Sequence, residues 1–371
     1  PAMNAQTIAD KTVELMRPLE PNPSLYVGQG YDGASVMAGK DGGVQKLIKD
    51  MGYQSAVYVH CASHRLNLVL SSTAEHYPEV KAFFDTLDLL HNFMSGSKRH
   101  AAFLEMQKAH YPNAPPLELV HSCDTRWSSR SLEVEKVLRR FDCILDTLEL
   151  FEDDADAETK LAASSLLLHI QTMKFVTFLV FFGKLYEFSE FCTKALQSPK
   201  TNVATCIGLI NEFTVRLQQF DYHQVVAYAS ELSNKFGITN FDVRVTRQRR
   251  MPSAFKSSHV LSTTGQNRSC DTDELTAQLH QVLGQISSEI RHRFADDQIG
   301  IMSTAACGLP SAGNFLCKQT ILKFANLFSL QVKEAELDVF KAFVLRQNTS
   351  EMKSLNDVLG VIDRDIFPFV Y

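Results

Sequence analysis

The chain has 371 residues, of which 45% are hydrophobic and 21% charged, and its formal net charge is -5. This composition is that of a globular protein, and it argues against a disordered chain or a histone-like protein held to nucleic acid by bulk charge. The eight cysteines have irregular spacing and form no CxxC pair, which favours reduced thiols in a cytosolic or nuclear protein over a disulfide scaffold.

The first seventy or so residues alternate between helix-like and β-prone segments. Apolar periodicity predicts helices over residues 3–16, 43–51 and 62–74, and short β-prone runs predict strands at 24–27 and 56–59. The order helix, strand, helix, strand, helix predicts a parallel strand pair with right-handed crossovers. Ligands usually bind at the carboxyl ends of such strands. Asp32 and the pair Cys61 and His64 both follow a predicted strand, so this edge is the first candidate site.

From about residue 78 the pattern becomes almost entirely helical, which predicts an all-α domain over 78–371 after an α/β segment over 1–77. The apolar run from Phe175 to Phe182 is too short to span a bilayer and predicts a buried helix. A Ser/Thr-rich stretch near 237–270 is expected to be a long mobile loop. Helices are expected over 80–94, 101–110, 131–151, 158–197, 203–236, 272–294, 315–328 and 335–343.

Asp32 lies in a glycine-rich turn, GQGYDGAS. A carboxylate at a strand end suits Mg²⁺, which takes oxygen ligands and often only one or two from the protein. The alternative, which the bare residues favour, is an Asx turn or a cap of the next helix. Gly28, Gly30 and Gly33 also match GxGxxG, but the nearest later carboxylate, Asp50, ends a predicted helix, so a dinucleotide site is a weak alternative.

Cys61 and His64 stand one helical turn apart and would share a face of a helix that begins near Cys61. Such a pair can be half of a zinc site, but the nearest candidates for the other half are only His121 and Cys123. We therefore favour a pair that positions backbone or substrate near the strand ends.

Two further segments carry residues that suit nucleic acid. Arg126 precedes the only tryptophan, Trp127, and this combination suits stacking or cation–π contacts with bases, although a core tryptophan behind a capping Asp124 is the simpler alternative. A basic cluster that includes Arg247, Arg249 and Arg250 could contact phosphates or direct nuclear import, or belong to a solvated loop. The acidic run over 152–158 favours a solvated turn beside a helix start rather than a metal site.

Taken together, three segments resemble the hAT superfamily of DNA transposases. YVGQGYDGAS, which holds Asp32, resembles the segment around the second catalytic aspartate; VHCASHRLNLV, which holds Cys61 and His64, resembles the CxxH motif; DTRWSS resembles the Arg-Trp motif that opens the helical insertion. Later segments, over 231–237 and 247–250, resemble the transposon-derived "zinc finger MYM-type protein 1-like" and "52 kDa repressor of the inhibitor of the protein kinase"-like group.

The resemblance implies an RNase H-like fold, partial over 1–77, interrupted by a helical insertion over 78–371. In that family two Asp and one Glu bind Mg²⁺ or Mn²⁺ and drive strand cleavage and transfer. Asp32 would be the second carboxylate, Cys61 and His64 would lie by the active site, and Trp127 near a flipped base. Arg126, Arg247, Arg249 and Arg250 would contact DNA. The implied setting is nuclear, with transposon ends as partners, a possible homo-oligomer and no membrane.

The chain also departs from the family pattern. The first aspartate would belong to a strand before Pro1, the glutamate would follow the insertion, and Val36 stands where the common pattern has Asn. We therefore expect a chain that has one of three metal carboxylates, binds no metal tightly and is catalytically incomplete. The alternatives are a domesticated DNA- or protein-binding scaffold without enzymatic activity, and an unrelated helical protein with a coincidental turn.

Overall fold

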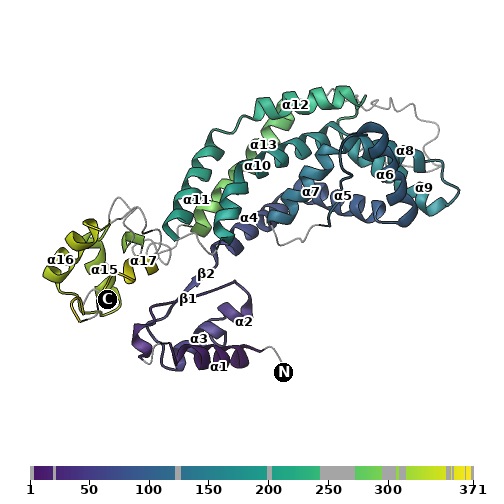
Figure 1. Ribbon diagram of the computed structural model, residues 1–371. Helices are drawn as coiled ribbons and strands as arrows, with labels where there is room; N and C mark the ends of the chain where they lie inside the picture. The colour runs from purple at the N-terminus through teal and green to yellow at the C-terminus, as the bar shows by residue number, and fades with distance from the viewer. Residues whose placement is uncertain are drawn as a thin grey trace, which may run out of the picture. The chain divides into compact units, whose positions relative to one another are not determined.

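The structure is a computed structural model, and it describes residues 4–19, 22–121, 127–198, 203–242, 272–294, 306–308, 315–347, 352, 355–363 and 365–368. It is predominantly helical, which confirms the mainly α prediction, and one two-stranded parallel sheet is present in these ranges (Figure 1). By its internal contacts the chain divides into two units. The first comprises residues 1–69, 191–215 and 288–371, and the second 70–190 and 216–287. The predicted division at residue 77 followed chain order, whereas these units do not.

The N-terminal part of the first unit is an α/β segment. Its elements in chain order are α1 (Ala5–Met16), η1 (Pro23–Leu25), β1 (Gly28–Tyr31), α2 (Ser35–Ala38), α3 (Val44–Asp50), β2 (Val57–His60) and α4 (Ala62–His76). Figure 1 shows α1 beside α3. Their apolar faces form a core in which Ala9 and Val13 of α1 meet Val44 and Ile48 of α3. The predicted parallel pair is confirmed, since Gly28 to Tyr31 pair with Val57 to His60 in register.

The first strand was predicted four residues too early. Residues 23–25 form a short 3-10 helix with Asn22 as its cap, and the strand occupies the glycine-rich segment that the sequence predicted as a turn. Glycine has a low intrinsic preference for strands. Pairing with β2 decides the outcome here, because every residue of β1 has a partner in the neighbouring strand.

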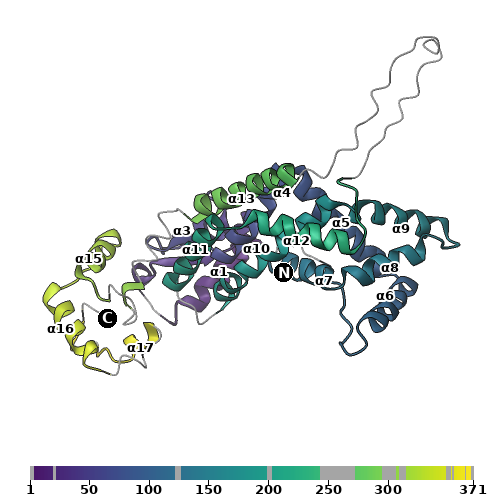
Figure 2. The ribbon, with the colours of Figure 1, turned by 90° about the horizontal axis from the view of Figure 1, so that it is seen from above.

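The second unit is built from helices α5 (Pro78–Met94), α6 (Ser97–His110), α7 (Trp127–Arg139), α8 (Phe141–Phe151), α9 (Ala157–Ile170), α12 (Tyr222–Lys235) and most of α10 (Met173–Gln197) and α13 (Thr272–Phe294). Most of α11 (Val203–Gln218) belongs to the first unit. Helix α8 packs against α6 and α9 (Figure 2). Three predicted helices are each two helices in the structure, and the breaks fall at Arg140, at 171–172 and at 219–221.

The apolar run of α10 is buried as predicted. Phe175, Phe178, Phe181 and Phe182 are all at most 5% exposed. Among the described helices no single one is long and apolar enough to cross a membrane. The pair α9 and α10, bent by 71°, passes that test together on length and composition alone.

The C-terminal part of the first unit has a core of its own. Its elements are η3 (Ala306–Gly308), α15 (Lys318–Leu327), α16 (Glu334–Leu345) and α17 (Leu355–Leu359). Leu337, Phe340 and Val344 of α16 pack with Phe315 and Phe367. The helices expected over 315–328 and 335–343 are therefore present with slightly different ends.

Candidate functional site

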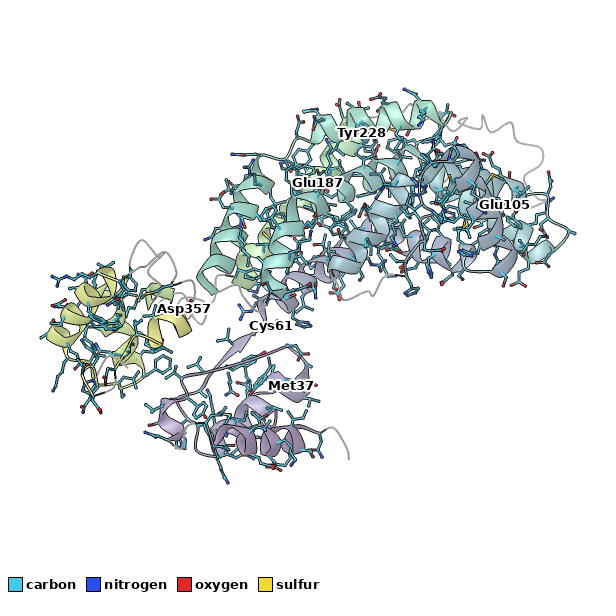
Figure 3. The ribbon with its side chains drawn as sticks, in the orientation of Figure 1. Met37, Cys61, Glu105, Glu187, Tyr228 and Asp357 are labelled. Atoms are coloured by element: carbon cyan, nitrogen blue, oxygen red, sulfur yellow. The ribbon has the colours of Figure 1, made fainter. Side chains whose placement is uncertain are left out.

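The carboxyl ends of β1 and β2 bring Asp32 and Cys61 next to each other. Tyr31 and His60 are paired at the last position of the sheet, and the backbone N–H of Cys61 donates to the carbonyl of Tyr31 at 2.7 Å. Asp32 is the next residue after Tyr31. Cys61, labelled in Figure 3, is an exposed free thiol immediately before the first residue of α4. Because the strands are parallel, the two predicted site segments share one edge of the sheet.

Asp32 has an exposed carboxylate held in a defined turn. Its Oδ1 accepts a hydrogen bond from the backbone N–H of Ala34 at 3.2 Å. The Tyr58 hydroxyl donates to the backbone carbonyl of Asp32 at 2.9 Å. The Asx turn that the sequence offered as an alternative is thus present. The other carboxylate oxygen has no hydrogen-bond partner in the described parts of the chain, so the turn and a cation ligand are compatible roles.

A row of four rings runs beside this turn. Tyr31 lies 6.3 Å from Tyr58, Tyr58 lies 6.4 Å from His60, and His60 lies 5.1 Å from His64, measured between ring centroids. A Cβ atom at Gly33 would come within 2.7 Å of Cε1 of His60. A side chain at position 33 would therefore have to displace the imidazole of His60 from the Asp32 turn.

His60 is a site residue that the sequence prediction missed. Its Nε2 is buried and has no hydrogen-bond partner among the described residues. Burial, then the charges of Arg65 and His64, lower the pKa of His60 to about 4. The ring is therefore neutral at neutral pH. The alternation of β2 was the available signal, because Tyr58 and His60 stand two residues apart and so share one face of the strand.

The stability of the fold is expected to fall as the pH drops from about 6.5 to about 4, and His60 is the cause. Above about pH 6.5 the ring is neutral in both the folded and the unfolded chain. Between about pH 6.5 and pH 4 the ring binds a proton in the unfolded chain but not in the folded chain, so protonation favours unfolding. Urea unfolding at several pH values checks this. His60→Phe should flatten the profile in this window, and an unchanged profile would contradict the environment described for His60.

Helix α13 reaches the same edge from far along the sequence. Arg65 of α4 is 5% exposed, and its Nη1 donates to the backbone carbonyl of Arg293 at 2.6 Å. The charge of Arg293 also contributes to the lowered pKa of His60. No local pattern could have indicated this contact, because the two arginines are separated by 228 positions.

Two alternative sites gain no support from the geometry. Gly28 and Gly30 lie within β1 rather than in a loop after a strand, and Asp50 pairs with Lys46, so the context of a dinucleotide-binding turn is missing. In the described ranges no group of three or more His, Cys, Asp or Glu side chains is placed to hold a metal ion. Cys123, the partner considered for a zinc site, lies outside those ranges.

The remaining predicted DNA contacts are not placed. Arg126, Arg247, Arg249 and Arg250 lie outside the described residues, as does most of the predicted loop. Trp127 is the first residue of α7, and its side chain is likewise not described. In the acidic run, Asp156 caps α9 by accepting from the N–H of Thr159, as expected of a turn at a helix start.

No protein-family model, no curated protein and no solved structure matches the chain.

Proposed function

We propose that the chain derives from the hAT superfamily of DNA transposases. In this proposal residues 1–77 are part of an RNase H-like fold, residues 78–371 are the helical insertion, and the natural ligand is DNA in the nucleus. One observation carries it: Asp32 follows one of two parallel strands, and Cys61 and His64 follow the other at the same edge. That juxtaposition is what the resemblance of the two segments implies.

Asp32 suits weak binding of a divalent metal. It is exposed, and only one of its carboxylate oxygens accepts a hydrogen bond within the described structure. Mg²⁺ is often held by one or two protein carboxylates and several waters. When bound, such a metal would activate an attacking oxygen or stabilise a leaving one. Because Asp32 is the one metal carboxylate that the resemblance identifies within these residues, we expect weak metal binding and no strand transfer by this chain.

A Mn²⁺ titration tests the role of Asp32. Binding is measured by electron paramagnetic resonance, as the decrease in the signal of free Mn²⁺. We expect weak binding that Asp32→Asn abolishes, because the substitution removes the charge and keeps the shape. Asp41→Asn is the matched control, since Asp41 is also exposed and lies nine residues further along the same segment. Equal binding by all three proteins would contradict the metal role of Asp32.

A second assay tests the expected incompleteness. The chain is incubated with hairpin-ended DNA in Mg²⁺ or Mn²⁺, and nicked and joined products are measured. We expect DNA binding without products. Metal-dependent products that disappear with Asp32→Ala would show that the chain is a complete enzyme. DNA binding in the absence of Mn²⁺ binding would favour the domesticated scaffold.

A further inference from the structure

We propose that the last turn of α13 binds the backbone phosphates of a nucleic acid beside Asp32, with Arg291 and Arg293 as the contacting residues. Only the identification of the phosphate ligand as nucleic acid rests on the proposed function. The location of the surface rests on the contact between α13 and the first turn of α4, which follows the end of β2.

The first step is the position of α13. Helix α4 begins directly after Cys61, and the buried Arg65 lies in its first turn. The guanidinium of Arg65 donates a hydrogen bond to the backbone carbonyl of Arg293. The last turn of α13 is therefore fixed at the edge where β2 ends. The same placement brings the charge of Arg293 close enough to His60 to contribute to the lowered pKa of that ring.

The second step is the charge of this turn. Arg291, His292 and Arg293 are consecutive in the last turn of α13. Arg291 and His292 are exposed, and Arg291 forms no ion pair with a described residue. The side chain of Arg293 is 25% exposed and pairs with Glu289 at 2.9 Å. Within the described ranges, then, no carboxylate competes with a ligand for the donors of Arg291.

The third step is the chemistry of the ligand. Guanidinium groups bind phosphates through paired N–H donors and are the common partners of nucleic-acid backbones. The chain as a whole has a net charge of -5, so attraction of a polyanion must come from local groups such as these. The exposed Asp32 follows β1 at the edge of the sheet to which the last turn of α13 is joined, and its charge and that of Arg293 both act on His60. A cation site and an arginine at one edge suit a phosphodiester, because both neutralise the charge of its oxygens.

Cations in the last turn of a helix have a structural explanation as well, because they interact favourably with the helix dipole. Arg216 provides the control for this effect. It is an exposed arginine in the last turn of α11, and it has no ion pair with a described residue. A dipole role predicts the same behaviour for Arg216 and Arg291, whereas a phosphate site predicts a difference.

The test is fluorescence anisotropy of a labelled 20-nucleotide DNA, single-stranded and duplex, with the full chain in EDTA at several NaCl concentrations. We expect Arg291→Ala to weaken binding about tenfold, as loss of one charged hydrogen-bonded contact does, and to make the salt slope shallower by about 1. Adding Arg293→Gln, which can still bond to Glu289, should weaken binding further. Arg291→Lys should restore most of the affinity, and Arg216→Ala should change neither quantity. Asp296 and Asp297, which follow in the sequence outside the described residues, stay unchanged in every variant.

Equal affinities and slopes for wild type, Arg291→Ala and Arg216→Ala would overturn the inference, and so would a wild-type chain that binds neither DNA. Because EDTA removes divalent metal, these results are independent of Asp32. Weaker DNA binding by Arg291→Ala together with normal Mn²⁺ binding by Asp32→Asn would leave the phosphate surface standing while the proposed metal site fails. Unchanged DNA binding by Arg291→Ala together with loss of Mn²⁺ binding by Asp32→Asn would support the metal site and overturn the phosphate surface.

Discussion

Replacement of Phe182 by alanine is expected to lower the free energy of unfolding of the second unit by about 3–5 kcal/mol. Phe182 is fully buried in the middle of α10. Its ring lies 4.8 Å from that of Phe84 and 5.4 Å from that of Phe83, both of α5, and 5.9 Å from Tyr186. These neighbours belong to helices that cannot collapse far into the space left by the ring, so a cavity adds to the lost transfer free energy.

Urea unfolding followed by the fluorescence of Trp127 measures this loss, because the only tryptophan of the chain begins a helix of the same unit. Phe188→Ala is the matched control. Phe188 lies six residues later on α10 in the same unit, but its side chain is 41% exposed, so its loss should cost about 0.5 kcal/mol. Equal costs for Phe182→Ala and Phe188→Ala would contradict the packing of α10.

Most helices could be predicted because their apolar periodicity is local, whereas the breaks between them depend on single side chains. Between α9 and α10 no proline or glycine marks the break, and the hydroxyl of Thr172 accepts from the N–H of Phe175. Between α11 and α12 the carboxylate of Asp221 accepts from the N–H of Gln224. Such capping residues are readable in a sequence. Here the continuous apolar pattern on both sides concealed them.

The candidate site was predictable in part, for the same physical reason. Asp32, Cys61 and His64 lie within a few residues of the strand ends, so local patterns could place them on one edge. To predict His60 as a site residue, the exact bounds of β2 were needed, and that strand was predicted one residue too early. Arg293 required a tertiary contact with Arg65, and no periodicity contains that information.

Replacement of Arg130 by methionine is expected to cost about 3–5 kcal/mol, because it leaves a buried carboxylate without its counter-charge. The Arg130 side chain is 8% exposed and that of Glu133, one turn later on α7, is 2% exposed. Nη1 of Arg130 lies 3.1 Å from Glu133, and the guanidinium also makes two hydrogen bonds to Asp88 of α5, at 3.2 and 3.3 Å. Burial alone would lower the pKa of Arg130, but Glu133 and Asp88 raise it above its usual value. The arginine therefore stays charged.

The double variant Arg130→Met with Glu133→Leu separates the cost of an orphaned charge from the value of the ion pair. Replacing both partners of a buried pair by apolar residues is often nearly neutral, so the double variant should be more stable than Arg130→Met alone in the same urea assay. The opposite order would show that Glu133 is not the charge that Arg130 neutralises.

The Arg130 guanidinium also lies 4.7 Å from the ring of Phe84, which contacts Phe182. Because they share this neighbour, substitutions at Arg130 and Phe182 should be non-additive. Helix α7, which begins at the tryptophan of the Arg-Trp segment, is thus held by the same core that Phe182 fills.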